Sequence, residues 1–439
     1  MSIFKPYDIR GVYPTEINED VFYRISKACV RYFGGKNVLV GGDGRVSTPL
    51  LKKAVISGLL EEGMSVYDLG IVSTSTFNFL ISSNKFDFGL QITASHNPKE
   101  FNGIKIYDSE GNNIGIGFGL EKIEEIFKEM RVEKKEKKGE YIDASEMKNQ
   151  HKQFLQAHLE SFDQSIGIDY SNGCGSIVFS DVIKDKIAAI EINKEIDGNF
   201  PAHPPEPTEE NLKELSRIVR EKGCVFGAAF DGDADRIVFL DENGKMIRGD
   251  RILYLFSKFL KPKKVVYEVS FPPLFKNLLR SMNADGIESK VGRTFIINEM
   301  RRNDADIGGE ISSHFYFKAT KFMEDAFYAF LLMIKILKET RESISQLLVD
   351  YPSFPYETFK FSVPEEKKHR IVEKIKEEAS KEFNIISIDG VKVIMDERNW
   401  FLIRASNTEP VIRVYVEGEN EEKMEKNKKL VVGLLNKFI

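Results

Sequence analysis

The sequence predicts an α/β protein built from several domains. Short apolar, strand-like runs alternate with amphipathic helical stretches along most of the chain, which is typical of α/β layers. The length of 439 residues is too great for one hydrophobic core, so about two to four domains are expected. Beyond about Pro352 the pattern changes to a strand, a helix, several strands and a closing helix, which indicates a small α+β domain.

The individual elements follow from apolar periodicity. We expect helices over residues 20–32, 49–62, 120–130 and 209–221, and strands over 37–40, 65–69, 88–93, 225–230 and 237–240. A long helix over 324–340 precedes the C-terminal region, where helices are expected over 365–383 and 421–438. Charge-rich residues 134–139 predict a solvated connection, and residues 241–244 a turn. The predicted domains are residues 1–145, 146–246, 247–348 and 349–439.

The overall charge is nearly balanced. Lys and Arg number 63 against 68 Asp and Glu, a formal net charge of −5, which argues against a general nucleic-acid partner. Basic residues that hold an anionic ligand must therefore be gathered locally.

The cysteines and the N-terminus indicate the compartment. The three cysteines, Cys29, Cys174 and Cys224, form no CxxC pair, as expected of a reduced, intracellular protein. The N-terminal residues lack the apolar core of a signal peptide, and the longest apolar stretch, 326–334, is too short to span a bilayer. We expect a cytoplasmic protein without a membrane partner.

Two short polar motifs carry the first chemical hypothesis. TASHNP, residues 93–98, places the hydroxyl of Ser95 in a tight loop after a strand. DGDADR, residues 231–236, supplies Asp231, Asp233 and Asp235 at alternate positions of a bent loop, an arrangement of hard oxygen ligands that suits Mg²⁺ or Ca²⁺. Unpaired, these carboxylates would repel one another, so a metal beside a phosphate explains them best.

DGDADR allows two other interpretations. An EF-hand calcium loop would place its ligands at the same spacing, but its sixth position, normally Gly, is Arg236, and the flanking segments are strands instead of helices. A solvated acidic turn between two strands is the simpler alternative for this motif taken alone.

Four loops in order give the chain a resemblance to the α-D-phosphohexomutase superfamily. They are TASHNP, DGDADR, GEISSH at residues 309–314 and RASNTEP at residues 404–410. Supporting matches are YDIRG (7–11), VGGDGR (40–45), FNGIKI (101–106), NGCGS (172–176) and KVGRTF (290–295). The resemblance covers nearly the whole length and implies four domains around a central cleft, three of them related mixed α/β domains and the last an α+β domain.

The resemblance implies a role for each loop. Ser95 would carry the phosphoryl group and join the three aspartates as a metal ligand, with one Mg²⁺ per chain. Arg10 and Arg236 would pair with the transferring phosphoryl group. Proton transfer or charge balance is open between Lys105 and His314, and His96 completes the set of expected catalytic residues. The sugar-binding residues would be Tyr7, Arg293, Glu310 and Ser312; the phosphate-binding residues would be Arg404, Ser406, Asn407, Thr408 and Arg413.

The implied reaction is the interconversion of hexose 1-phosphate and hexose 6-phosphate. Phospho-Ser95 would give its group to the sugar, and the resulting hexose 1,6-bisphosphate would turn over and return its other phosphate. Glucose 1,6-bisphosphate is the expected activator, and hexose phosphates are the expected partners. Assembly into a homo-oligomer is left open.

Departures from the usual family pattern limit the substrate assignment. Ser313 stands where Gly is common, STST at residues 73–76 replaces a frequent Pro-Thr-Pro turn, and Pro-Glu-Pro at 205–207 replaces Pro-Asn-Pro. Ile311 does not assign the chain to glucose and mannose or to glucosamine phosphates. A glucose or mannose mutase is favoured, with a phosphoglucosamine mutase as the near alternative. An Mg²⁺-dependent sugar phosphatase and a non-catalytic sugar-phosphate binder remain as alternatives from other classes.

Overall fold

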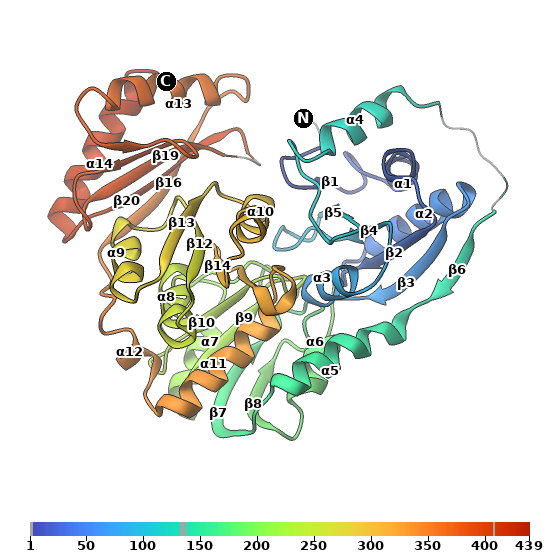
Figure 1. Ribbon diagram of the computed structural model, residues 1–439, viewed down its shortest axis with the longest axis horizontal. Coiled ribbons are helices and arrows are strands. Elements are labelled where there is room, and N and C mark those ends of the chain that lie inside the picture. The colour runs from blue at the N-terminus through green and yellow to red at the C-terminus, as the bar shows by residue number, and fades with distance from the viewer. Residues whose placement is uncertain (1–2, 132–135, 137, 407–408) are drawn as a thin grey trace. The chain divides into compact units, whose positions relative to one another are not determined.

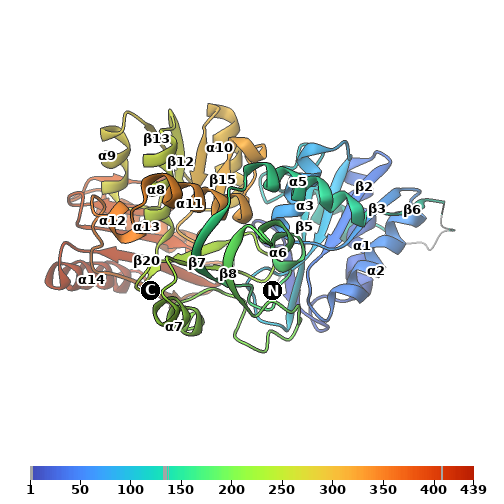
Figure 2. The same cartoon turned by 90° about the horizontal axis from the view of Figure 1, so that it is seen from below.

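The computed structural model describes residues 3–131, 136, 138–406 and 409–439. By its internal packing the chain forms two compact units, one of residues 1–252 with 312–347 and one of residues 253–311 with 348–439. The described strands form four sheets, and Figures 1 and 2 show their ribbons from two sides. The fold class predicted from the sequence, three α/β domains and a distinct C-terminal domain, is confirmed.

The first sheet of the first unit has six strands. Their order is β1 (Ile9–Val12), β5 (Phe101–Asp108), β4 (Phe88–Ile92), β2 (Asn37–Gly42), β3 (Ser65–Ile71) and β6 (Glu140–Asp143). The central strands β4, β2 and β3 run parallel, and their buried apolar residues suit a sheet covered on both faces. Figures 1 and 2 both show helices α1 (Glu19–Phe33) and α2 (Thr48–Glu61) on one face and α3 (Thr74–Ser83) on the other. Helix α4 (Leu120–Glu129) packs beside α1.

The second sheet has five strands. Their order is β11 (Met246–Ile247), β10 (Ile237–Leu240), β9 (Gly227–Phe230), β7 (Phe162–Asp169) and β8 (Ile187–Ile192). Strands β8, β7 and β9 are parallel, whereas β9 and β10 form an antiparallel pair whose connecting loop carries the three aspartates. The helices of this region are α5 (Lys148–His158), α6 (Ser176–Ile183) and α7 (Lys213–Lys222), preceded by the 3₁₀ turn η1 (Ser145–Met147).

The first unit also includes a later part of the chain. It comprises β15 (Phe315–Phe317), the 3₁₀ turn η2 (Lys318–Thr320), α11 (Ala326–Thr340) and α12 (Ile344–Leu347). Helix α11 begins at an aspartate cap, since the side chain of Asp325 accepts the backbone N–H groups of Phe327 and Tyr328 at 3.0 Å each. The helix is apolar on nearly all sides because it is buried within this unit.

The second unit begins within α8 (Gly249–Leu260). Three parallel strands follow it in this unit, with β12 (Lys264–Glu268) between β13 (Asp285–Ser289) and β14 (Ile307–Gly309), and the helices are α9 (Pro273–Ser281) and α10 (Arg293–Asn303). The C-terminal sheet is antiparallel, in the order β16 (Tyr356–Ser362), β20 (Val411–Glu417), β19 (Trp400–Ala405), β18 (Val391–Ile394) and β17 (Ile385–Ile386). One face of that sheet packs on α13 (Lys368–Ala379) and α14 (Glu421–Asn436). The other face meets Val269 and Val291 of the preceding domain through Trp400 and Leu402.

Most predicted elements lie where the sequence placed them. Strand β10 has the predicted bounds, whereas α7 begins four residues later than predicted because residues 209–212 form a turn before it. Helix α13 is shorter than predicted at both ends. Of the predicted connection at 134–139, residues 134, 135 and 137 lie outside the described residues. The domain boundaries stay a prediction.

Among the residues that the structure describes, no helix combines the length and the apolar character needed to cross a membrane.

Candidate active site

Ser95 lies in a turn directly after β4, at the carboxyl end of a parallel strand. Its backbone adopts φ = 51°, in the left-handed region that few residues other than glycine occupy. The residue is only 3% exposed, and its Oγ donates a hydrogen bond to Oδ2 of Asp231 at 2.7 Å. The two predicted loops, 136 residues apart in sequence, therefore meet through the serine hydroxyl.

The backbone of the serine loop is held by one buried guanidinium. Arg45 donates to the carbonyl oxygens of Ser95 and Asn97 at 2.7 and 2.6 Å. It also donates to the carbonyls of Pro98 and Phe101 at 2.7 and 3.0 Å. Because charged hydrogen bonds are the stronger ones, this contact set fixes the loop in its left-handed turn.

The three aspartates converge in the loop between β9 and β10. One carboxylate oxygen from each of Asp231, Asp233 and Asp235 lies within 4.8 Å of the others, and all three residues are buried. Oδ1 of Asp231 also accepts the backbone N–H groups of Asp235 and Arg236 at 3.1 and 3.2 Å, which closes the loop. Burial and the two neighbouring carboxylates raise the pKa of Asp231 well above its usual value.

Lys105 supplies a positive charge to this cluster. Its Nζ donates to Oδ2 of Asp233 at 2.7 Å and to Oδ2 of Asp235 at 2.6 Å. Burial and the charge of Asp235 act to raise the pKa of Asp233, but Lys105 outweighs them and the pKa is lowered. The three carboxylates are thus not unpaired even without a metal, because Lys105 of β5 balances part of their charge.

The cluster also meets the requirements of a hard divalent cation. Three carboxylates offer oxygen ligands at one point, and Oδ1 of Asp233 is buried with no hydrogen-bond partner among the described residues. An unpaired buried carboxylate oxygen is costly unless a cation binds it. The residues present therefore fit an Mg²⁺ ion.

Arg10 contacts the serine loop, and His96, within that loop, lies near the serine hydroxyl. Arg10, on β1, donates to Oδ1 of Asn97 in the serine loop and to Asp8. Nδ1 of His96 lies 3.4 Å from Oγ of Ser95. Burial, together with the positive charges of Arg236 and Arg10, holds the pKa of His96 well below its usual value, so its ring is neutral at neutral pH.

His314 connects the GEISSH loop to the aspartates. Its Nε2 lies 3.2 Å from Oδ1 of Asp235 and 3.4 Å from Nε of Arg236, and its Nδ1 lies 3.0 Å from Oγ of Ser312. Since the guanidinium can only donate, Nε2 cannot bond to both neighbours in one protonation state. Which neighbour Nε2 bonds to therefore depends on whether that nitrogen carries a proton.

The second unit holds the predicted phosphate-binding residues. Arg404, at the end of β19, donates to Oδ2 of Asp389 at 3.1 Å, and the same oxygen accepts the backbone N–H of Val291 at 3.1 Å. Oγ of Ser406 accepts from Nε of Arg413 at 3.3 Å. Asn407 and Thr408, also predicted to bind phosphate, lie outside the described residues.

The predicted sugar-binding residues are divided between the units. Tyr7 and Ser312 belong to the first unit, whereas Glu310 and Arg293 are buried in the second. In the second unit, the backbone N–H of Ile311, next to Glu310, donates to Oε1 of the buried Glu268 at 3.0 Å. Burial raises the pKa of Glu268.

Several site residues were missed by the sequence argument. Arg45 appeared only within a supporting motif, and neither Glu268 nor Asp389 was singled out. Two threonines, Thr74 and Thr93, donate to Asp233 at 2.7 and 3.0 Å. Thr93, Arg45 and Thr74 each stand in a segment that the sequence analysis names, but their partners are distant in sequence and no local pattern identifies them.

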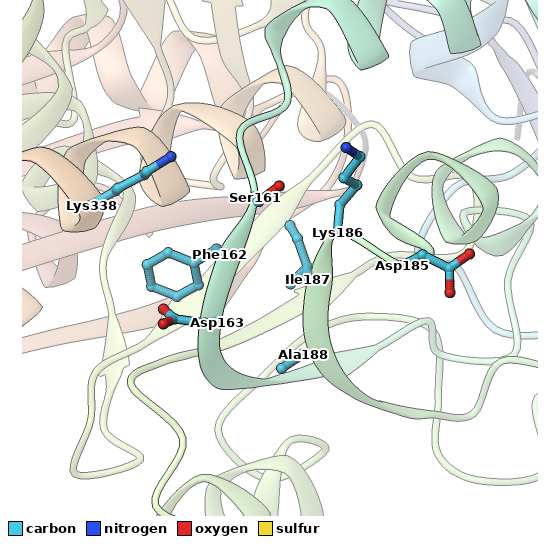
Figure 3. Close-up of a pocket in the computed structure, with 8 residues that line it drawn as sticks. All are labelled: Ser161, Phe162, Asp163, Asp185, Lys186, Ile187, Ala188 and Lys338. Carbon is cyan, nitrogen blue, oxygen red and sulfur yellow. The ribbon is translucent and has the colours of Figure 1, made fainter.

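A hollow of about 560 Å³ beside β7, β8 and α11 lies away from these residues (Figure 3). It is found where β7 and β8 begin, whereas the aspartate loop follows the end of the parallel strand β9. Its lining is Ser161, Phe162, Asp163, Asp185, Lys186, Ile187, Ala188 and Lys338. No predicted site residue belongs to it.

Comparison with known proteins agrees with this geometry. Residues 1–134, 140–244 and 248–354 match, in order, the models of phosphoglucomutase/phosphomannomutase alpha/beta/alpha domains I, II and III. Residues 359–433 match the C-terminal domain of the same proteins.

Individual relatives match over their full length. The phosphomannomutase of Methanocaldococcus jannaschii is 33% identical over 100% of this chain and 98% of its own. The phosphoglucosamine mutase of Methanococcus aeolicus is 30% identical over 98% of this chain and 99% of its own. The crystal structure of a phosphoglucomutase/phosphomannomutase family protein from Burkholderia thailandensis has a TM-score of 0.89 at 27% identity, covering 99% and 96% of the two chains.

Similarity of this extent, in all four domains, places the protein among the phosphohexomutases, which are isomerases of carbohydrate metabolism. The chain belongs to the phosphoglucomutase/phosphomannomutase family.

Proposed function

We propose that this protein is an Mg²⁺-dependent mutase that interconverts hexose 1-phosphate and hexose 6-phosphate, with glucose or mannose as the sugar. Phospho-Ser95 gives its phosphoryl group to the sugar, and dephospho-Ser95 later takes the second phosphate of a hexose 1,6-bisphosphate. The observation that carries the proposal is the hydrogen bond of 2.7 Å from Ser95 to Asp231 within the aspartate cluster. A hydroxyl aimed at a buried set of metal-type ligands suits phosphoryl transfer better than simple binding.

The groups around Ser95 have separate tasks. Phosphoryl transfer depends on positioning and on neutralisation of charge, so the cations nearest the serine matter most. Arg236 and Arg10 pair with the transferring group. His96 is neutral and lies 3.4 Å from the serine hydroxyl, where it orients Ser95 without adding charge.

The metal-binding residues are Asp231, Asp233 and Asp235, with Ser95 as the fourth contributor. Bound there, one Mg²⁺ per chain supplies Lewis-acid chemistry that draws charge from the phosphoryl group. The carboxylate of Asp231 also accepts the hydroxyl of dephospho-Ser95, which fixes the direction of its oxygen lone pairs.

Two groups are placed to handle the proton of the sugar hydroxyl. Lys105 is buried against Asp233 and Asp235, and His314 lies between Asp235 and Arg236. The pH dependence of turnover in Lys105→Met and His314→Gln distinguishes them, because only loss of the acid–base group abolishes one limb of the profile.

The remaining predicted residues bind the parts of the substrate that do not react. We assign the stationary phosphate to Arg404, Ser406 and Arg413, and to Asn407 and Thr408 of the same motif. We assign the sugar hydroxyls to Glu310 and Ser312, with Tyr7 and Arg293. The four domains then carry, in order, the phosphoserine, the metal loop, the sugar loop and the phosphate loop, and glucose 1,6-bisphosphate activates enzyme whose serine has lost its group.

A phosphoglucosamine mutase is the second candidate. It is favoured by the relative from Methanococcus aeolicus, which bears that name and is nearly as similar as the phosphomannomutase. The reaction class is the same, and only the substituent on the sugar differs.

The test compares glucose 1-phosphate, mannose 1-phosphate and glucosamine 1-phosphate at equal Mg²⁺ and bisphosphate. Conversion to a 6-phosphate, with label from the bisphosphate appearing on Ser95, supports the proposal, and the best substrate decides between the candidates. Ser95→Ala should lose turnover and labelling while still binding the sugar phosphate. Release of inorganic phosphate in place of isomerisation would indicate a phosphatase, and binding without turnover a non-catalytic binder.

We also infer a cytoplasmic location. All three cysteines are buried thiols that form no disulfide, as expected in a reducing compartment.

A further inference from the structure

The first residue of α3 makes two contacts to one metal-type ligand. The backbone N–H of Thr74 donates to the carbonyl of Asp233 at 2.7 Å. The Oγ1 of Thr74 donates to the Oδ2 of Asp233, also at 2.7 Å. Thr74 is fully buried, so water does not compete for either bond. Main chain and side chain of Asp233 are thus both held by the start of one helix.

A second threonine joins the same carboxylate to the nucleophile. Oγ1 of Thr93 donates to Oδ2 of Asp233 at 3.0 Å and accepts the backbone N–H of Ser95 at 2.9 Å. Lys105 adds a third donor to Oδ2. The two oxygens of Asp233 are therefore unlike: Oδ2 accepts three hydrogen bonds, whereas Oδ1 is buried with no partner among the described residues.

The hydroxyl of Thr74 donates its hydrogen bond to Asp233 instead of to Gln91. Oε1 of Gln91 also lies near Oγ1 of Thr74, at 3.1 Å. A hydroxyl has one proton to donate, and a charged acceptor at 2.7 Å binds it more strongly than a neutral one at 3.1 Å.

The start of α3 is itself held firmly. Oγ of Ser75 donates to the carbonyl of Ala234 at 2.7 Å and accepts the N–H of Ala326, the first residue of α11, at 3.1 Å. Oγ1 of Thr76 lies 3.0 Å from Nδ1 of the buried His151 on α5. Contacts to two other helices and to the aspartate loop leave this helix end little freedom.

We propose that Thr74 and Thr93 are positioning residues for the metal: their hydroxyls hold Oδ2 of Asp233 so that Oδ1 faces the cation. Neither hydroxyl is a metal ligand or touches the sugar. Outer partners of this kind orient a ligand and raise its affinity for metal without adding a coordination bond. The inference rests on the metal-dependent function proposed above.

The test measures metal binding directly. Mn²⁺ is titrated into the full-length protein, and free Mn²⁺ is followed by electron paramagnetic resonance for the wild type, Thr74→Val, Thr93→Val and Thr74→Ser. The valine variants keep the side-chain shape and should bind Mn²⁺ about 10- to 100-fold more weakly. Thr74→Ser retains the hydroxyl and should bind within a few-fold of the wild type. The Mg²⁺ concentration that half-activates turnover should rise in parallel.

A matched control separates positioning from general loss of stability. Oγ1 of Thr320 is equally buried and donates at 2.7 Å to the carbonyl of Met323 instead of to a carboxylate. Thr320→Val should lower the melting temperature as the valine variants do, with Mn²⁺ affinity unchanged. If Thr74→Val does not fold, Thr93→Val and the serine variant carry the comparison.

Two outcomes would overturn the inference, and they differ. Wild-type affinity in both folded valine variants would remove the positioning role and leave the proposed function intact. A wild-type protein that binds no Mn²⁺ would remove the metal assignment and the positioning role together.

Discussion

Replacing Lys105 by methionine tests whether its ammonium stands in for part of the metal's charge. The side chain is 3% exposed, and its Nζ lies 2.7 and 2.6 Å from carboxylate oxygens of Asp233 and Asp235. Methionine has a similar length but no charge, so Lys105→Met leaves three buried carboxylates within 4.8 Å of one another without this cation. Removing one partner of a buried ion pair costs about 3–5 kcal/mol.

The expected result is a large loss of stability that Mg²⁺ largely reverses. Without metal, the first thermal transition should fall by about 5–8 °C for a compact unit of this size. Mg²⁺ at about 100 times its Kd adds about 2.7 kcal/mol to the free energy of unfolding of a folded protein that binds it. The variant should gain more from Mg²⁺ than the wild type, because the cation then balances charge that Lys105 balances in the wild type.

Differential scanning calorimetry with EDTA and with excess Mg²⁺ gives the four melting temperatures needed. Lys27→Met is the matched control: Lys27 is 1% exposed and pairs with Glu61 at 3.0 Å and Glu62 at 3.3 Å, away from the aspartates. Lys27→Met should be destabilised to a similar degree and should gain no more stability from Mg²⁺ than the wild type does. Equal Mg²⁺ gains in the wild type and Lys105→Met would refute the reasoning.

Two of the three further predictions address other parts of the site, and the third addresses a buried ion pair outside it. Arg404→Ala should raise KM roughly 10- to 100-fold with kcat less affected, because a charged hydrogen bond contributes about 1.5–3 kcal/mol to binding. Steady-state kinetics measure both constants, and an unchanged KM would contradict the phosphate-binding role of Arg404. Asp233→Asn should raise the Mg²⁺ concentration for half-activation at least about tenfold, because losing a metal ligand should weaken metal affinity at least as much as losing a residue that orients it. An unaltered Mg²⁺ titration would count against Asp233 as a ligand. Partial burial alone would lower the pKa of His203, but Asp169 at 3.1 Å outweighs the burial and raises that pKa. The ion pair therefore stabilises the fold fully below the unfolded pKa of His203, which is about 6.5. This stabilisation is lost as the pH rises through the pKa of the folded state. The free energy of unfolding of the wild type should therefore exceed that of His203→Gln by more at pH 5.5 than at pH 8.5. An equal difference at both pH values would contradict the stabilising role of the ion pair.

Much of the fold could be predicted because local patterns encode it. Strand β10 and helices α1 and α2 appear within two residues of their predicted bounds, since apolar periodicity and helix caps are local features. The start of α7 was predicted less well, because a turn over residues 209–212 has the same polarity as a helix end. Which strands pair, and which helices cover which face, depends on long-range packing that periodicity does not report.

The amino-acid sequence by itself determined the chemical groups of this site: a serine and three alternate aspartates, each placed where a predicted strand ends. Only the tertiary structure decided their partners. Lys105 and Thr74 reach Asp233 from 128 and 159 residues away, and Arg45 reaches the serine loop from another strand end. No local pattern specifies which donor meets which oxygen, because hydrogen bonds and ion pairs act over about 3 Å and depend on how the sheets and helices pack.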